Sequence, residues 1–348
     1  MVLLRCFGRL NCGFLRYGGG MEAVVLHEFG GPEVLGLERY PDPVAEPGWV
    51  IVRVRACAVN WHDVLVRRGL YNSPLPHVLG ADGAGERMDT GEPVMILPSL
   101  WWGDDDSAPG GGFEILGDSH PGTHAELVRV PEECAVPKPR GLSWSGAAAL
   151  PLVGVTAYRA LVSRGRLRAG ESVLILGAGG GLATMAISLA SGIGASVVVT
   201  SSSWGKVERA KEVGATDGVL YTEHNWAEAA KQCTPGVRGF DLVIDSVGTW
   251  RDSLKALRPG GRLVVLGAAQ ADAAVLDIRP FYFGQFELIG TTMGSPRDFA
   301  GLLTLLDEGV VEPPVIDTTF PLDAAAAAHE RIESGAAFGK VALSVDTG

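Results

Sequence analysis

Apolar runs alternate with helical patterns through the second half of the chain. Residues 173–176 form an unbroken apolar run, as expected of a parallel strand that is covered on both faces. Further strands are predicted at residues 196–203, 218–222, 240–248 and 261–268, with helices at 206–213, 225–232 and 250–257. This alternation predicts an α/β fold, a doubly wound parallel sheet with right-handed crossovers over residues 148–284.

A glycine-rich turn joins the first apolar run to a helix. Small residues at Ala178, Gly180 and Ala183 let the backbone approach a dinucleotide pyrophosphate, which needs free N–H groups and the positive end of a helix. Taken alone, such a turn is more typical of a flexible loop, but the repeating strands and helices around it favour a dinucleotide site. The residues expected to line the pyrophosphate are Ala178, Gly179, Gly180, Gly181 and Leu182.

The rest of the chain has a different pattern. Between residues 21 and 147, short strands are separated by Pro and Gly turns, which predicts a compact barrel-like β domain. Residues 285–348 resume this pattern, so we expect the second domain to be built from both ends of the chain. Residues 1–20 contain three Arg and no acidic residue, and we expect them to lie outside the fold. We interpret them as an extension from an upstream start codon in preference to a transit presequence.

Composition narrows the class of protein. The chain has 348 residues and a net charge of −11, which argues against a nucleic-acid partner. Its apolar runs are too short for a membrane span, so no membrane partner is expected. Five cysteines without paired spacing are typical of a reducing compartment, and we expect a cytoplasmic protein.

Several motifs then appear in one order along the chain. They are VNWHD at 59–63, LGADGAG at 79–85, GTHAE at 122–126, AAALPL at 147–152, GVTAY at 154–158, the glycine turn, RAKEVGA at 209–215, RPGGR at 258–262 and FGKV at 338–341. From residue 21 to the end, the chain resembles the medium-chain dehydrogenase/reductases. The resemblance implies a Rossmann NADP-binding domain, a GroES-like catalytic domain, and a homodimer that pairs through an edge strand near residues 287–294.

The chain departs from the zinc-bearing members of that family. Asn60 stands where they have Cys, Ala81 and Asp82 stand where they have His and Glu, and residues 150–152 offer no third ligand. Residues 99–122 replace their four-cysteine lobe and contain no Cys. One remaining carboxylate cannot hold catalytic zinc, so we expect no metal, and the chain resembles the quinone oxidoreductase branch.

Without a Lewis acid, an unactivated alcohol is a poor hydride donor. A quinone or an α,β-unsaturated carbonyl accepts hydride more readily, because its negative charge spreads to an oxygen that hydrogen bonds can stabilise. We therefore expect the protein to reduce a small quinone or activated carbonyl.

The second predicted strand bears on the choice of cofactor. Sites for NAD usually end this strand with Asp or Glu, whereas here Thr200 is followed by Ser201, Ser202 and, further on, Lys206. Hydroxyls and an ammonium would bind a 2′-phosphate, so NADPH (NADP) is preferred, and the resemblance places Tyr221 in the same pocket. These serines would equally cap the helix that begins near Trp204.

Site residues follow mostly from the resemblance. Asn60 would face the nicotinamide or donate to the carbonyl, unless it is only a turn residue. His62 would pass a proton to the reduced oxygen, unless it is a packing histidine. Asp63 would orient His62 or form a salt bridge to Arg67 or Arg68, and of the two the structural role is favoured. The remaining cofactor contacts are implied at Thr156 beside the nicotinamide, at the strand ends Val247, Gly267 and Thr291, and at the C-terminal residues Phe338 and Lys340.

Two further hypotheses stay open. Because no indispensable catalytic side chain is identified, the protein could bind NADPH without turnover, as a sensor or structural protein. A zinc-less enzyme of the alcohol dehydrogenase type is the other.

Overall fold

The apolar runs in the middle of the chain form a six-stranded parallel sheet. The structure, a computed structural model, describes residues 20–71, 73–269 and 273–345, so the predicted N-terminal extension lies outside it except for Gly20. The order of the sheet is β13-β12-β11-β14-β15-β16. These strands are β11 (Ser172–Ile175), β12 (Ser196–Ser201), β13 (Asp217–Leu220), β14 (Phe240–Asp245), β15 (Leu257–Val265) and β16 (Glu287–Gly290). We call this unit the parallel-sheet domain.

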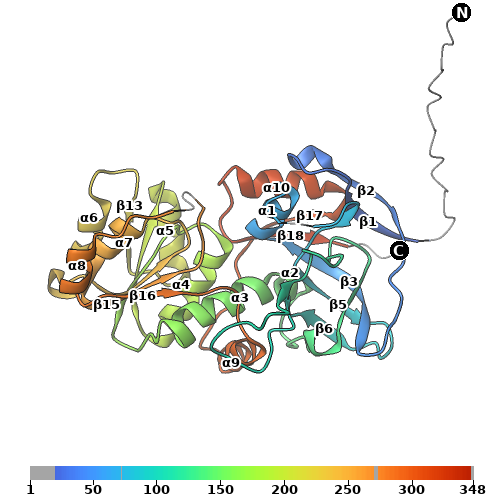
Figure 1. Cartoon of the computed structure of the whole chain (residues 1–348), viewed down its shortest axis with the longest axis horizontal. Helices are drawn as coiled ribbons and strands as arrows, with labels where there is room; N and C mark the ends of the chain where they lie inside the picture. The colour runs from blue at the N-terminus through green and yellow to red at the C-terminus, as the bar shows by residue number, and fades with distance from the viewer. Residues whose placement is uncertain (1–19, 72, 270–272, 346–348) are drawn as a thin grey trace, which may run out of the picture.

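Helices cover both faces of this sheet (Figure 1). Counted along the chain, the strand order is 3-2-1-4-5-6, so the order reverses between β11 and β14, where such sheets bind ligands. The doubly wound sheet predicted from the sequence is confirmed. Its helices are α3 (Pro151–Tyr158) with the π-helix η3 (Arg159–Arg164), α4 (Gly181–Ile193), α5 (Trp204–Val213), α6 (Trp226–Gln232), the 3-10 helix η4 (Pro235–Val237), α7 (Trp250–Ala256), α8 (Ile278–Phe283) and α9 (Pro296–Asp307).

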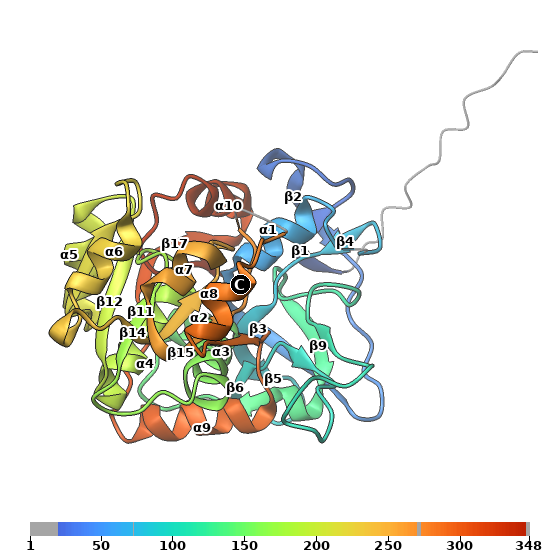
Figure 2. The same ribbon diagram turned by 60° about the vertical axis from the view of Figure 1, so that its left-hand side comes forward.

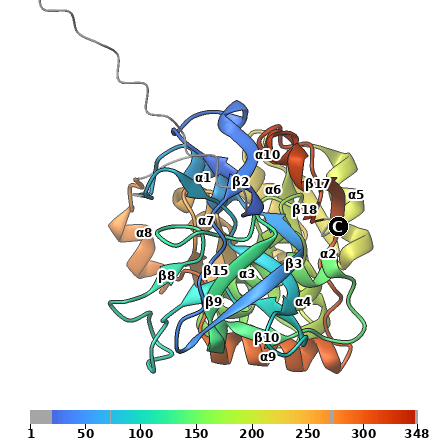
Figure 3. The same ribbon diagram turned by 90° about the vertical axis from the view of Figure 1, so that its right-hand side faces the viewer.

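Strands from both ends of the chain build the other unit, the barrel domain. Its main sheet has the order β10-β6-β5-β3-β18-β17, and β9 pairs with β3. Figure 3 looks onto this side, where the long strand β3 crosses the view. The strands of this sheet are β3 (Trp49–Val59), β5 (Asp82–Arg87), β6 (Pro93–Ile96), β9 (Leu127–Pro131), β10 (Ala135–Pro137), β17 (Ile316–Pro321) and β18 (Lys340–Ser344).

Smaller elements complete the barrel domain. One small sheet joins β2 (Leu35–Tyr40), β1 (Met21–Leu26) and β4 (His77–Val78), and another joins β7 (Ser99–Leu100) and β8 (Glu114–Ile115). The helices are α1 (Trp61–Arg67), α2 (Trp144–Ala149) and α10 (Ala325–Glu333), with 3-10 turns η1 (Pro32–Val34), η2 (Glu132–Cys134) and η5 (Leu322–Ala324).

The two domains exchange chain segments at their junction. Strand β16 pairs with β15, so the parallel sheet continues past residue 284, where the sequence placed its end. Helix α9 then packs on α3, below it in Figure 2. Strand β18 finally returns to the barrel domain and pairs antiparallel with β3. The last strand therefore starts at the boundary between the domains, beside the glycine turn.

Candidate functional site

The glycine turn leaves the N-terminus of α4 open. Thr200 on β12 accepts hydrogen bonds from the N–H groups of Gly177 (3.1 Å) and Ala178 (2.8 Å), which fixes the turn to the neighbouring strand. Helix α4 begins after Gly180, which has no side chain to cap it, and the first intrahelical bond runs from Thr184 N to Gly180 O at 2.9 Å. The helix thus presents N–H groups without intrahelical partners, as a pyrophosphate requires.

Two lysines flank this turn. A Cβ atom added at Gly179 would lie 2.9 Å from Nζ of Lys206, and one added at Gly181 would lie 2.6 Å from Cδ of Lys340. At Gly180, between them, an added Cβ would meet no atom within 4 Å. The turn therefore has one open position between two covered ones, with the Lys206 ammonium on one side and the aliphatic stem of Lys340 on the other.

The C-terminal segment docks directly on the turn. Gly339 donates a hydrogen bond to the carbonyl of Gly179 at 2.9 Å, and the guanidinium of Arg209 lies 4.2 Å from the centre of the Phe338 ring. Asp317 accepts from the N–H of Phe338 at 2.9 Å. The structure thus brings Phe338 and Lys340 to the turn, as the resemblance implied.

The end of β12 offers hydroxyls and one ammonium. Ser203 caps α5 by accepting from the N–H of Lys206, and Ser201 is buried and accepts from the N–H of Ser203 at 3.2 Å. Ser202 and the ring of Tyr221 are exposed beside them. Capping therefore accounts for Ser203, whereas Ser202 and Tyr221 remain available to a ligand.

Lys206 is held over the turn by its surroundings. Its ammonium donates to the carbonyl of Gly335. Burial lowers the pKa of Lys206, and the positive charges of Arg209 and Arg331 lower it further, against the opposing effect of Asp317. An added anion at this point would favour the charged ammonium.

Buried polar groups form a cluster at the junction of the domains. The Lys340 ammonium donates to Oδ1 of Asn60 and lies 2.9 Å from Oδ2 of Asp82. Nδ2 of Asn60 donates to the same Asp82 oxygen at 2.9 Å, and the N–H of Leu152, at the start of α3, donates to Oδ1 at 2.8 Å. Burial raises the pKa of Asp82, although Lys340 and Asn60 oppose this effect.

Asn60 is already fully engaged in this cluster. Its Nδ2 also donates to the carbonyl of Ala58 at 3.4 Å, and its side chain is buried. The predicted donation from Asn60 to a substrate carbonyl is therefore not available in this arrangement. Asn60 instead positions Asp82 and Lys340.

The cluster does not fit a catalytic zinc ion. The positions that hold ligands in zinc-bearing relatives are Asn60, Ala81, Asp82 and residues 150–152, and both oxygens of Asp82 bind groups of this chain. An ammonium, which repels a metal cation, lies between Asn60 and Asp82. Among the residues that the structure describes, no group of three His, Cys, Asp or Glu could hold a metal ion.

Asp63 binds backbone groups and not the predicted partners. Its carboxylate accepts from the N–H groups of Asn60 (2.7 Å) and Ala81 (3.1 Å), so it fixes the start of α1 against the turn before β5. Arg67 and Arg68, its expected ion-pair partners, both bind Glu333 on α10. Asp63 is thus a structural residue that neither orients His62 nor pairs with an Arg.

His62 has a partner that sequence reasoning missed. Its Nε2 lies 2.6 Å from Oδ1 of Asp118, and the ring of Tyr71 meets its ring edge-on at 4.7 Å. Burial lowers the pKa of His62, but the hydrogen bond and charge of Asp118, together with Asp63 and Asp82, outweigh burial and raise it. Nothing in the local pattern of residues 99–122 distinguishes Asp118 from the other acids there.

The segment that carries Asp118 is anchored by a buried arginine. Arg159 donates to the carbonyls of Asp106 (2.9 Å) and Ser107 (2.8 Å), pairs with Asp298 at 2.8 Å, and lies over the ring of Trp102. Trp102 itself is 2% exposed. This segment is therefore packed onto α3 and α9.

The remaining predicted contacts lie at strand ends of the parallel sheet. Oδ1 of Asp245 accepts hydrogen bonds from the N–H groups of Val247 and Gly248, both at 2.8 Å. Gly267 lies against Ser246, whose carbonyl would be 2.6 Å from an added Cβ. The Thr291 hydroxyl is buried without a partner among the described residues.

Thr156, on α3, is turned inward. Its hydroxyl donates to the carbonyl of Leu152 at 2.6 Å, and the sulfur of Met293 is 3.9 Å from the same oxygen. Thr156 is thus near the start of the helix that Asp82 caps.

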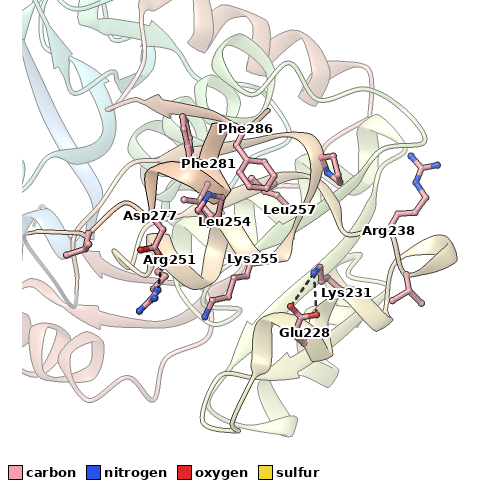
Figure 4. A pocket seen from close by; sticks show the side chains of 14 residues that line it. Glu228, Lys231, Arg238, Arg251, Leu254, Lys255, Leu257, Asp277, Phe281 and Phe286 are labelled. Carbon is pink, nitrogen blue, oxygen red and sulfur yellow. Dashed lines mark hydrogen bonds and ion pairs between the residues drawn. The ribbon is translucent and has the colours of Figure 1, made fainter. Parts of the chain in front are cut away.

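A pocket of about 460 Å³ lies elsewhere on the parallel-sheet domain, among α6, α7 and α8 (Figure 4). Leu254, Leu257, Phe281 and Phe286 line it, and the pairs Lys231–Glu228 and Arg251–Asp277 are at its rim. It shares no residue with the site described above.

In the described part of the chain, no helix has the length and apolar character needed to cross a bilayer.

Comparisons with known proteins agree with this architecture. Residues 46–140 match the family model of the alcohol dehydrogenase GroES-like domain, and residues 181–308 match that of the zinc-binding dehydrogenases. The quinone oxidoreductase of Mus musculus is 33% identical, over 90% of this chain and 95% of its own. The 2-methylene-furan-3-one reductase of Solanum lycopersicum is 33% identical, over 93% of this chain and 79% of its own.

Solved structures give the same result. A crystal structure described as an NAD-dependent alcohol dehydrogenase is 37% identical, with a TM-score of 0.88, and the match covers 94% of this chain and 100% of that one.

Proposed function

Because the chain belongs to the medium-chain dehydrogenase/reductase family, in its quinone oxidoreductase-like branch, we propose that it is a zinc-independent reductase that uses NADPH to reduce a quinone or an α,β-unsaturated carbonyl. The class, an oxidoreductase of this family, follows from the comparisons.

The contact between Lys340 and Asp82 carries the proposal. It places a positive side chain between the two polar residues that stand at ligand positions of zinc-bearing relatives. A site with this donor set supplies no Lewis acid to form an alkoxide from an alcohol. An acceptor that delocalises the incoming charge onto its own oxygen does not need one.

The open N-terminus of α4 and the two flanking lysines favour a phosphorylated dinucleotide. N–H groups at Gly181 and Leu182 would hold the pyrophosphate, and Ser202, Tyr221 and Lys206 would hold a 2′-phosphate. No carboxylate stands at residues 200–203 to bind ribose hydroxyls instead. When bound, this cofactor supplies a hydride.

His62 would supply the proton that accompanies the hydride. It lies two residues after Asn60, and its raised pKa means that the imidazolium form persists to a higher pH than in an unperturbed histidine. Asn60, Asp63 and Asp82 would hold the surrounding backbone in place. Since these groups are bound within the protein, we assign the proton step to His62.

A panel of acceptors tests the proposed function. The purified protein is incubated with NADPH or NADH and a series of quinones, enones, aldehydes and alcohols, and loss of the reduced nicotinamide absorbance is followed. We expect consumption of NADPH with quinones or enones. Binding of NADPH without consumption by any acceptor would support a sensor or structural protein, and oxidation of alcohols would support the alcohol dehydrogenase type.

We also propose a homodimer that pairs through β16. This strand lies at the edge of the parallel sheet, and a two-fold axis would pair it with its own copy. Helix α8 beside it exposes Ile278 and Phe283, each at 72%. Sedimentation should find a dimer that Phe283→Glu weakens and that Val44→Glu, on the barrel domain, leaves intact. A monomeric wild-type protein would contradict this assembly.

A further inference from the structure

Asp118 and His62 face each other from two segments that are distant in sequence. His62 lies in the first turn of α1, and Asp118 follows the short strand β8. We propose that Asp118 is a positioning residue that holds His62 as the proton donor of this site, an inference that rests on the proposed function. The two groups lie 2.6 Å apart, and their side chains are only 10% and 17% exposed.

The backbone around Asp118 is fixed independently of His62. The N–H of Asp118 donates to the carbonyl of Ile115 at 3.1 Å, and the ring of His77 binds the carbonyl of Gly117 at 2.7 Å. Gly117 has φ +91, and an added Cβ would lie 3.1 Å from the backbone of Gly80, directly before the Ala81-Asp82 pair. The carboxylate is therefore presented by a segment that packs against the backbone directly before Asp82 of the buried polar cluster.

The imidazole ring is held on two sides. Asp118 binds Nε2, and Tyr71 packs edge-on against the ring. No hydrogen bond to Nδ1 occurs within the described ranges, so this nitrogen is the one that can exchange a proton with a substrate. A carboxylate on one ring nitrogen fixes the ring orientation and stabilises the imidazolium form.

The reduction consumes one hydride and one proton. Hydride adds to the acceptor with its electron pair, and the negative charge develops on the acceptor oxygen. That oxygen takes the proton from Nδ1 of His62, which leaves a neutral imidazole hydrogen-bonded to Asp118. Water from solvent returns one proton to His62 before the next turnover. Asp118 keeps its negative charge throughout.

Other charged and titratable groups face the same ring. Asp63 on α1 and Asp82 on β5 favour the protonated imidazole, and burial opposes it. Tyr71 is a neutral neighbour whose own pKa burial and Asp118 raise. Asp63 and Asp82 are already bound to backbone and side-chain donors, whereas Asp118 binds the ring directly. Removing the Asp118 charge should therefore have the largest effect on His62.

NMR titration of the histidine rings tests the positioning role without cofactor or substrate. The His62 signals are assigned with His62→Gln, and their pKa is measured in wild type, Asp118→Asn and Asp118→Glu. We expect Asp118→Asn to lower the pKa of His62 by about one unit, a differential interaction of about 1.4 kcal/mol. Asp118→Glu should restore part of the shift, and Asp104→Asn, on the same segment but exposed, should change nothing.

The pH dependence of turnover tests the proton-donor role. His62 must be protonated to act, so activity should fall as the pH rises through its pKa, and Asp118→Asn should move this limb to lower pH. A His62 pKa that is unchanged in Asp118→Asn would overturn the positioning role. A protein that turns over with the same pH profile in His62→Gln would overturn the donor role alone, whereas no turnover with any acceptor would overturn the proposed function.

Discussion

The ammonium of Lys340 lies 2.9 Å from the carboxylate of Asp82, although 258 positions separate them in the chain. Lys340 is the first residue of the last strand, β18. Its side-chain stem lies over Gly181 at the start of α4, and its ammonium reaches the barrel domain. One buried ion pair thus links the glycine turn, the start of α3 and the first turn of α1. Removing one partner of this ion pair should therefore lower the stability of the folded protein.

Removing the positive partner should destabilise the protein. Lys340→Met leaves the Asp82 carboxylate buried without its counter-ion, and we expect a loss of about 3–5 kcal/mol in the free energy of unfolding. The double variant Asp82→Asn with Lys340→Met removes both charges and should lose less than Lys340→Met alone. Urea denaturation measures both, and equal losses in the single and double variants would contradict a buried ion pair.

The open glycine should matter for the cofactor and little for the fold. An added methyl at Gly180 meets no protein atom, so Gly180→Ala should unfold at nearly the wild-type urea concentration while the Kd for NADPH rises about tenfold or more, about 1.4 kcal/mol. Gly205→Ala, also in open space but on α5, is the matched control. Unchanged NADPH binding in Gly180→Ala would place the pyrophosphate elsewhere.

Lys206 should distinguish the two nicotinamide dinucleotides. If it binds the 2′-phosphate, Lys206→Ala removes a charge-assisted hydrogen bond. The Kd for NADPH should then rise by about 10- to 100-fold, while the Kd for NADH stays nearly unchanged. Fluorescence titration with each cofactor provides the comparison. Lys211→Ala removes an exposed cation from the same helix and should affect neither. Equal weakening of both cofactors would assign Lys206 to the pyrophosphate instead.

Chelation should have no effect on the reaction. Since the ligand positions hold Asn60, Ala81 and the Lys340-bound Asp82, we expect well below one zinc ion per chain by elemental analysis. Dialysis against EDTA should leave activity and unfolding temperature unchanged. Activity that disappears on chelation and returns with zinc would show that the cluster rearranges around a metal.

Two buried histidines should make the protein sensitive to acid. His124 and His329 lie edge-on at 5.9 Å, and none of their ring nitrogens has a partner among the described residues. Burial lowers the pKa of both; Lys340 also lowers that of His124, against Asp63, and the pKa of His329 is further lowered by His124 and Arg67. Below about pH 6.5 the unfolded chain therefore binds protons that the folded protein does not.

Stability should accordingly fall as the pH decreases from about 6.5, by at most about 1.4 kcal/mol per pH unit for each histidine. His329→Gln should reduce this slope, whereas exposed His224→Gln should leave it unchanged. Urea denaturation between neutral and mildly acidic pH measures the slopes. Parallel curves for wild type and His329→Gln would contradict a depressed pKa at His329.

Local patterns were sufficient for the parallel-sheet domain. Its strands are buried on both faces, so they appear as continuous apolar runs, and the turn after β11 must have small residues for a purely local reason. The ends of elements were less accurate: β13 ends at Leu220 and β16 at Gly290, because pairing with a neighbour decides where a strand stops. The substitutions at the positions of zinc ligands in relatives were equally visible, since they are differences in residue type.

The chain by itself determined the two domain types, the glycine turn after β11 and the residue types at the positions of zinc ligands in relatives. Only the tertiary structure shows that Lys340 binds Asp82 and that Asp63 accepts hydrogen bonds from backbone N–H groups. It also shows that the partner of His62 is Asp118, 56 residues further along the chain. Periodicity and residue type act through neighbours along the chain, whereas these contacts depend on where loops and strand ends meet after folding. A carboxylate in a loop has no local signal that tells which buried cation or imidazole it will face.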